Sequence, residues 1–146
     1  MSKPSQTQID TLRLSIDALV RVFRITDSPS LGPDSPKLNP PDMQALLFVA
    51  QNPDCISSDV GGFLGVVPTT TSALVDRLVR QGLLSRARTE ANRRVVLLRL
   101  TGPGEAVVRQ IIAQQNDHCR IMLEALSETE RDAFLSAARK IATAIA

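Results

Sequence analysis

The sequence predicts a mainly α-helical domain that carries one small two-stranded β-sheet. Apolar residues recur at helical spacing along most of the chain, whereas residues 94–101 alternate with the period of two that is typical of a strand. The length of 146 residues and the 43% hydrophobic content suit a single domain with its own core. We therefore expect one domain that spans residues 1–146.

The first expected helix runs from about Thr7 to Thr26 and has one apolar stripe. This stripe consists of Ile9, Leu12, Ile16, Leu19, Val20 and Phe23. The segment 28–41, SPSLGPDSPKLNPP, contains five prolines and cannot form a regular element. We expect a long, irregular connection there, which is either mobile or lines a pocket.

The second helix is expected to begin after Asn39, which can cap it, with Pro40 in the first helical position. The sequence NPD at 52–54 should end this helix. Its expected buried side chains are Met43, Leu46, Leu47 and either Val49 or Ala50.

A third helix is expected over Asp59–Leu64, with Ser57 or Ser58 as its cap. It contains two adjacent glycines, Gly61 and Gly62, and each costs about 0.8–1.0 kcal/mol of helix stability relative to Ala. Either a neighbouring helix approaches closely at these glycines, or the segment is soft.

The stretch 68–101 is the most basic part of the chain. It holds seven arginines against two acidic residues, for a formal charge of +5, whereas the whole chain carries +2. A basic block in an otherwise mildly acidic protein is typical of a surface that binds a polyanion.

A helix is expected to begin at Pro68, in the first helical position. Its apolar face consists of Val67, Thr71, Leu74, Val75 and Leu78. The opposite face and its flanks carry Thr69, Thr70, Ser72, Ala73, Asp76, Arg77 and Arg80. Hydroxyls and small methyls can contact DNA phosphates and base edges, and the planar fork of Arg77 makes it the best candidate to contact guanine. A solvated helix surface is the alternative.

Two strands are expected at Leu84–Arg88 and Arg94–Thr101, after a Gly-Leu-Leu turn. The polar sequence TEANR between them would place Asn92, Arg93 and Arg94 at the tip of a hairpin. Arginines at such a tip suit the narrow minor groove of DNA, whose negative potential attracts them. A solvated hairpin loop is the alternative.

A long helix is expected over about Gly102–Ala125, capped by Thr101. Ser127 and Glu130 then form a capping box for a last helix. Both chain ends are therefore amphipathic helices, and their apolar stripes favour a two-fold interface with a second copy of the chain. Packing of these helices within one subunit is the alternative.

Residues 64–104 resemble the winged helix-turn-helix of the MarR (multiple antibiotic resistance) transcriptional regulators. The resemblance is carried by LVDRLVRQGLLSR (74–86), by RRVVLLRLT (93–101) and by the glycine that follows. Asn92 departs from it, because the family usually has Asp there, so an Asp–Arg pair that braces the wing is not expected. Gly61 departs from it too, as does its neighbour, since that helix is usually richer in Ala and Leu.

The resemblance implies a homodimer that binds double-stranded DNA at an inverted repeat, as a repressor that a small aromatic or phenolic ligand releases. Residues 39–101 would form the winged helix-turn-helix lobe, and residues 7–26 and 102–146 the dimerisation helices. The predicted DNA-binding residues are Thr69, Thr70, Ser72, Ala73, Arg77, Asn92, Arg93 and Arg94. The ligand would lie among the first helix, the proline-rich connection and the second helix. A winged-helix module that binds protein instead of DNA is the alternative.

The sequence offers no catalytic or metal-binding cluster, so we expect neither enzyme activity nor a cofactor. His118 is the one histidine, and its neighbour Cys119 would point about 100° away on a helix. Cys55, expected in a loop, is a weak candidate for a reactive thiol. No apolar run is long enough to span a bilayer and no signal-peptide pattern opens the chain, which leads us to expect a cytoplasmic protein without a membrane partner.

Overall fold

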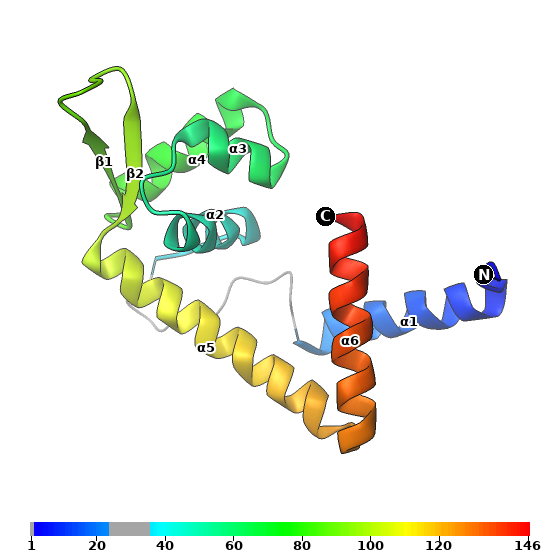
Figure 1. Ribbon diagram of the computed structural model, residues 1–146. Coiled ribbons are helices and arrows are strands. Elements are labelled where there is room, and N and C mark those ends of the chain that lie inside the picture. Colours follow the sequence, from blue (N-terminus) through cyan, green and yellow to red (C-terminus); the bar gives the residue numbers. More distant parts are fainter. Residues whose placement is uncertain (1, 24–35) are drawn as a thin grey trace. The chain divides into compact units, whose positions relative to one another are not determined.

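The computed structural model describes residues 2–23 and 36–146 (Figure 1). It has the mainly helical architecture and the β-hairpin that the sequence predicts. In chain order the elements are α1 (Gln6–Phe23), α2 (Pro40–Gln51), α3 (Ser57–Leu64), α4 (Pro68–Arg80), β1 (Leu84–Arg88), β2 (Val96–Leu100), α5 (Gly102–Glu124) and α6 (Glu128–Ile145). The predicted end of the first helix, 24–26, and the predicted connection as far as residue 35 lie outside the described residues.

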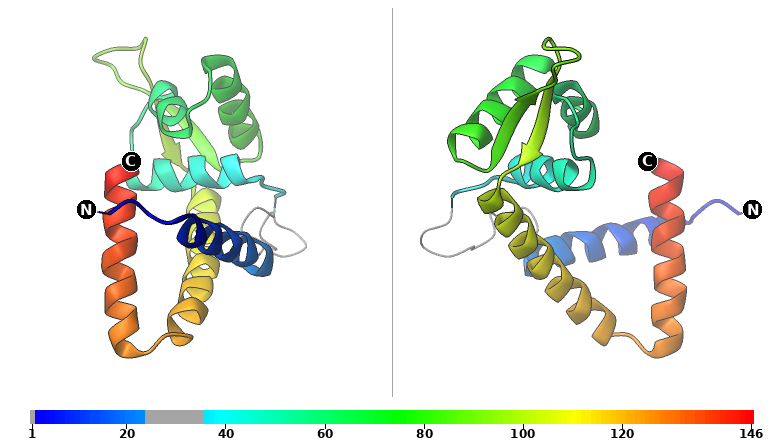
Figure 2. Two further views of the ribbon diagram at one scale, coloured as in Figure 1. Left: turned by 90° about the vertical axis from the view of Figure 1, so that its right-hand side faces the viewer. Right: turned by 60° about the vertical axis from the view of Figure 1, so that its left-hand side comes forward.

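The chain divides into two compact units, residues 1–111 and 112–146, and the boundary falls inside α5. In the first unit, α2, α3 and α4 pack on one another and on the hairpin (Figures 1 and 2). We call α2, α3, α4, the hairpin and the part of α5 before residue 112 the winged-helix lobe.

The hairpin is a two-stranded antiparallel sheet, in which Leu84 lies opposite Leu100 and Arg88 lies opposite Val96. Leu98 also forms a β-bridge with Cys55, whose carbonyl accepts the Leu98 N–H at 2.7 Å. This bridge attaches the chain between α2 and α3 to the edge of β2 that does not pair with β1.

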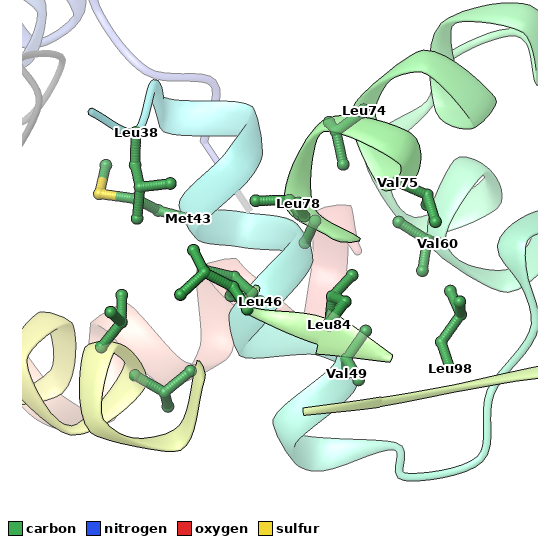
Figure 3. Close-up of a cluster of buried hydrophobic side chains, with 14 of the residues drawn as sticks. Leu38, Met43, Leu46, Val49, Val60, Leu74, Val75, Leu78, Leu84 and Leu98 are labelled. Carbon is green, nitrogen blue, oxygen red and sulfur yellow. The ribbon is translucent and has the colours of Figure 1, made fainter. Parts of the chain in front are cut away.

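The hydrophobic core lies in the winged-helix lobe, and Figure 3 shows most of its side chains. The core consists of Leu38, Met43, Ala45, Leu46, Val49, Cys55, Val60, Leu74, Val75, Leu78, Leu83, Leu84, Leu98, Val107, Val108 and Ile111. Burying one Leu, Ile or Val side chain contributes about 1.5–3 kcal/mol, so this cluster holds the lobe together.

The predicted caps of α2 and α6 are confirmed. The Asn39 side chain accepts the N–H of Asp42 at 2.9 Å, and the Asp42 carboxylate accepts the N–H of Asn39 at 3.2 Å. Ser127 and Glu130 form the same reciprocal pair ahead of α6. The hydrogen bonds from the Ser127 backbone and side chain lower the pKa of Glu130 below its ordinary value.

The predicted start of α3 is wrong by two residues, and the predicted cap is wrong as well. The helix begins at Ser57, and the apolar residue Ile56 occupies the N-cap position. The Asp59 carboxylate accepts the N–H of Ile56 at 3.0 Å, which satisfies a backbone donor without a hydroxyl cap. Neither Ser57 nor Ser58 is therefore the cap.

Two further details differ from the prediction. The second strand begins at Val96 instead of Arg94, because the N–H of Arg94 binds the Asn92 side chain and the N–H of Val95 binds the Asn92 carbonyl. Val67, predicted on the buried face of α4, is 61% exposed. It precedes the helix as its N-cap, so helical spacing does not place its side chain.

Gly61 marks a close approach between α3 and α4, as one of the two sequence interpretations proposed. A Cβ added to Gly61 would lie 2.6 Å from the Oγ1 atom of Thr71, whereas a Cβ added to Gly62 would meet nothing within 4 Å. The Thr71 side chain is buried and its hydroxyl donates to the Val67 carbonyl at 3.2 Å. Only the first glycine is therefore required by packing.

The helices at the two chain ends bury little of their apolar surface within one chain. Neither α1 nor α6 has a buried residue. The exposed large side chains of these helices are Ile9, Leu12, Leu14, Ile16, Leu19, Val22, Phe134, Leu135, Ile141 and Ile145. Because rows of exposed apolar side chains are rare on monomers, a partner surface is expected to cover them.

Gly61→Ala should destabilise the lobe by about 1–3 kcal/mol, because a methyl group there must displace the buried Thr71 side chain. Gly62→Ala is the matched control, and it should be neutral or stabilising by up to about 1 kcal/mol, since Ala is the better helix former. Urea unfolding of the two variants measures both effects. Equal midpoints would contradict the close approach of α3 and α4.

Candidate nucleic-acid interface

Helix α4 presents a hydroxyl-bearing face because its other face is held in the core. Thr71, Leu74, Val75 and Leu78 are buried. The predicted contact residues Thr69, Thr70, Ser72 and Ala73 are all exposed, on the first two turns of the same helix. The structure therefore brings four of the eight predicted site residues together on one outward surface.

The tip of the hairpin carries three more of the predicted residues, Asn92, Arg93 and Arg94, and all three are exposed. The tip lies at the end of the winged-helix lobe opposite the start of α5 (Figures 1 and 2). The Asn92 side chain accepts the N–H of Arg94 at 3.2 Å, so it shapes the turn.

A guanidinium from the first strand braces this turn. Arg88 donates from Nη1 to the carbonyl oxygen of Arg93 at 2.8 Å. Thr89 adds a second brace, since its hydroxyl accepts the Asn92 N–H at 3.1 Å. Hydrogen bonds to its own backbone therefore fix the wing, although Asn92 has no carboxylate with which to pair an arginine.

The seven arginines of the basic stretch do not contribute equally to the surface charge. Three of them have acidic partners: Arg77 with Asp42, Arg86 with Asp76, and Arg99 with Asp54. Among the residues that the structure describes, the other four, Arg80, Arg88, Arg93 and Arg94, have no acidic partner, and all four are exposed. These four therefore supply most of the positive charge that a phosphate backbone would meet.

Arg77, the remaining predicted site residue, lies on the flank of α4 and faces the start of α2. Its Nη2 atom donates to the Asp42 carboxylate at 2.5 Å. The Arg77 side chain is 39% exposed, whereas that of Asp42 is 2% exposed. The guanidinium is thus held by a carboxylate of the protein, while more than a third of the Arg77 side chain stays exposed.

The ion pair between Asp54 and Arg99 involves the loop between α2 and α3. Asp54 has a positive φ of 66° and binds Arg99 of β2. The hydrogen bond with the Asp54 carboxylate raises the pKa of Arg99 above its ordinary value. This pair lies next to the Cys55–Leu98 bridge and joins the same loop to the sheet.

Cys55 is a packing residue in this structure. It is 8% exposed. Burial, with Asp59 nearby, raises the pKa of the Cys55 thiol above its ordinary value, which favours the unreactive neutral form at physiological pH. The sequence hypothesis of a reactive Cys55 thiol receives no support from this environment.

A hollow of about 410 Å³ opens between α3 and the start of α4. It is lined by Ser57, Ser58, Gly61, Gly62, Gly65, Val66, Pro68, Thr71 and Ser72. These residues come from α3, from the turn after it and from the first two turns of α4. Among the described residues, no group of three or more histidine, cysteine or acidic side chains is placed to hold a metal ion.

Two participants were missed at the sequence level. Arg80 is exposed near the end of α4, and its position on the face opposite Leu74 and Leu78 was a sufficient signal. Arg88 braces the wing, but its partner is a backbone carbonyl, which no residue pattern reveals.

No helix among the described residues combines the length and apolarity needed to cross a membrane.

Comparison with known sequences agrees with this geometry. Residues 37–95 match the sequence model of the MarR family. The Bacillus subtilis HTH-type transcriptional regulator YsmB is 26% identical over 104 residues, 71% of each chain. The Escherichia coli transcriptional repressor MprA is 29% identical over 84 residues, 58% of this chain and 48% of MprA.

Three solved structures share the fold. Streptococcus pneumoniae FabT, solved in complex with DNA, has a TM-score of 0.80 at 23% identity, over 95% of this chain and 96% of its own. Streptomyces coelicolor PcaV, solved with its natural ligand, has a TM-score of 0.60 at 22% identity, over the whole of both chains. A MarR family protein from Bacillus stearothermophilus has a TM-score of 0.77 at 26% identity, over 98% and 99%. The chain is therefore similar to the MarR family of transcriptional regulators in sequence over residues 37–95, and it shares their fold over nearly its whole length.

Proposed function

We propose that this protein is a sequence-specific repressor of transcription that binds an inverted-repeat operator in double-stranded DNA as a homodimer. The observation that carries the proposal is the pairing, on one lobe, of an exposed hydroxyl-bearing helix face with a braced wing that carries unpaired arginines. FabT, which shares the fold, was solved with DNA, and the relative MprA is a transcriptional repressor. The protein would act in the cytoplasm, where it meets its operator.

In this function α4 enters the major groove. The hydroxyls of Thr69, Thr70 and Ser72 can donate to or accept from base edges, and the Ala73 methyl can contact the methyl group of thymine. Burial of the opposite face in the core holds these groups in a fixed orientation. Arg80 lies further along the exposed face and can reach the phosphate backbone.

The wing would lie along the neighbouring minor groove. Arg93 and Arg94 supply the positive charge, and a narrow minor groove concentrates the negative potential that attracts it. Asn92 would contribute through the shape of the tip, because its side chain is bound to the backbone of Arg94.

The dimer would form through α1, α5 and α6, which corresponds to residues 7–26 and 102–146. The motive is the row of exposed apolar side chains on the terminal helices. Residues 39–101 would then form one DNA-binding lobe per subunit, and the two-fold axis would relate two recognition helices.

We further propose that a small aromatic or phenolic ligand releases the DNA. PcaV, which shares the fold, was solved in complex with its natural ligand. The expected lining combines α1, the connection before Leu38 and the start of α2. Part of that lining lies outside the described residues.

Selection of bound sequences from a random duplex pool should return an inverted repeat. Two recognition helices related by a two-fold axis meet the major groove about one helical turn apart, ~10 base pairs between half-site centres. Affinity for the selected duplex should also fall steeply with salt, because phosphate contacts release counterions. Recovery of single half-sites would contradict the dimer, and a flat salt response would favour a protein-binding module.

Arg94→Ala should weaken binding to every duplex about equally. The expected change in the slope of log affinity against log salt is about one unit per lost phosphate contact. The melting temperature should stay near that of the unaltered protein, since Arg88 and Thr89 brace the wing. A large fall in melting temperature with an unchanged salt slope would show that Arg94 is structural.

Replacing both Ile141 and Ile145 with Asp should dissociate the dimer or unfold the chain, because charges would enter an apolar interface. Ser136→Asp with Thr143→Asp adds the same charge to the opposite face of α6 and is the matched control. Light scattering at several protein concentrations measures the mass. An unchanged dimer in the first variant would place the interface elsewhere.

A further inference from the structure

We propose that Asp42 is a positioning residue for α4, the recognition helix. Its bond to Arg77, which lies on α4, fixes the orientation of this helix in the DNA groove. This inference rests on the proposed DNA-binding function and deepens it. It differs from the sequence-level prediction that Arg77 contacts a base, since it assigns base discrimination to Thr69, Thr70, Ser72 and Ala73.

The first observation is the position of the Asp42 carboxylate. Asp42 is 1% exposed, at the first turn of α2. One of its oxygens accepts from Arg77 Nη2 at 2.5 Å, and the other accepts the N–H of Asn39 at 3.2 Å. A carboxylate buried to this degree is costly without a positive partner, so its pairing with Arg77 is strongly favoured over solvation of Arg77.

The second observation is where the pair acts. Arg77 is 35 residues beyond Asp42 in sequence, so the bond joins the start of α2 to the last turn of α4. The contacts of α4 with the core are apolar, through side chains such as Leu74 and Leu78, and an exposed ion pair between Asp76 and Arg86 joins α4 to β1. Apolar burial is non-directional, whereas a charge-assisted hydrogen bond has a preferred geometry. The ion pair therefore restrains rotation of α4 about its own axis, which sets the direction of the hydroxyl-bearing face.

The test uses the full chain and the duplex selected from the random pool, together with a set of single-base variants of that duplex. Asp42→Asn removes the charge but keeps the shape of the side chain. It should weaken binding to all duplexes by about tenfold, the order of the coupling between contacting residues, without changing their relative affinities. Val49→Ala, which opens a cavity in the same core, is the control for lost stability. At a temperature well below both melting points, the control should bind like the unaltered protein.

Arg77→Met separates the three roles that an arginine could play here. A positioning residue gives a uniform loss with an unchanged salt slope, because Asp42 already neutralises the charge. A base contact gives a loss confined to one position of the site, and a phosphate contact lowers the salt slope by about one. Either of the last two results would overturn the proposal.

The double variant Asp42→Asn with Arg77→Met should bind no more weakly than the poorer of the two single variants, because both act through one bond. Losses of affinity that multiply in the double variant would overturn the shared role.

Should Asp42→Asn fail to fold, Arg77→Lys is the second variant to test, and it should recover affinity relative to Arg77→Met at an unchanged salt slope. Asp42→Asn binding as tightly as the unaltered protein would overturn this inference alone. Absence of binding by the unaltered protein would overturn the proposed function as well.

Discussion

Burial of one face of α4 is the interaction on which the rest of the structure depends. The core of the winged-helix lobe contains Leu74, Val75 and Leu78. Thr71 packs closely on Gly61, where there is no room for a side chain. This packing exposes the opposite face of α4 over its first two turns. It also brings the following strands back across the lobe, so that the wing is carried by the same core. A helix and a hairpin held by one core keep a fixed separation, which the two grooves of a duplex require.

The local rules of helices and turns were sufficient to predict most elements. Asn39 and Ser127 cap α2 and α6 as predicted, because a capping box involves residues three apart in sequence. The start of α3 was not predictable in the same way. Ile56 has no capping side chain, and the bond is made instead by Asp59, which reaches back from within the helix. Residue preferences point to a hydroxyl at the cap and therefore to the wrong position.

The candidate site shows a sharper limit, since charge can be counted in a sequence but pairing cannot. The basic stretch carries seven arginines, yet the partners Asp42 and Asp54 lie 35 and 45 residues from Arg77 and Arg99. Both acids stand outside the stretch, so its formal charge overstates what a phosphate backbone meets. The exposed residues of α4 were predictable from helical spacing alone, because spacing decides which side is buried. The pairing of Arg77 with Asp42 depends on a tertiary contact, which spacing does not contain.

The winged-helix lobe and the terminal helices obtain their stability in different ways, and this difference bears on the proposed regulation. The winged-helix lobe has its own core, whereas α1 and α6 bury no residue within one chain. Geometry within one lobe is therefore set by the monomer. In the proposed dimer, the spacing between two lobes is set by helices that need a second copy. Helix α5 belongs to both units, since Val107 and Ile111 lie in the core of the lobe and the helix continues to Glu124. In the proposed regulation, a ligand that alters the dimer helices would change operator affinity by changing the spacing of two intact recognition helices, without unfolding either lobe.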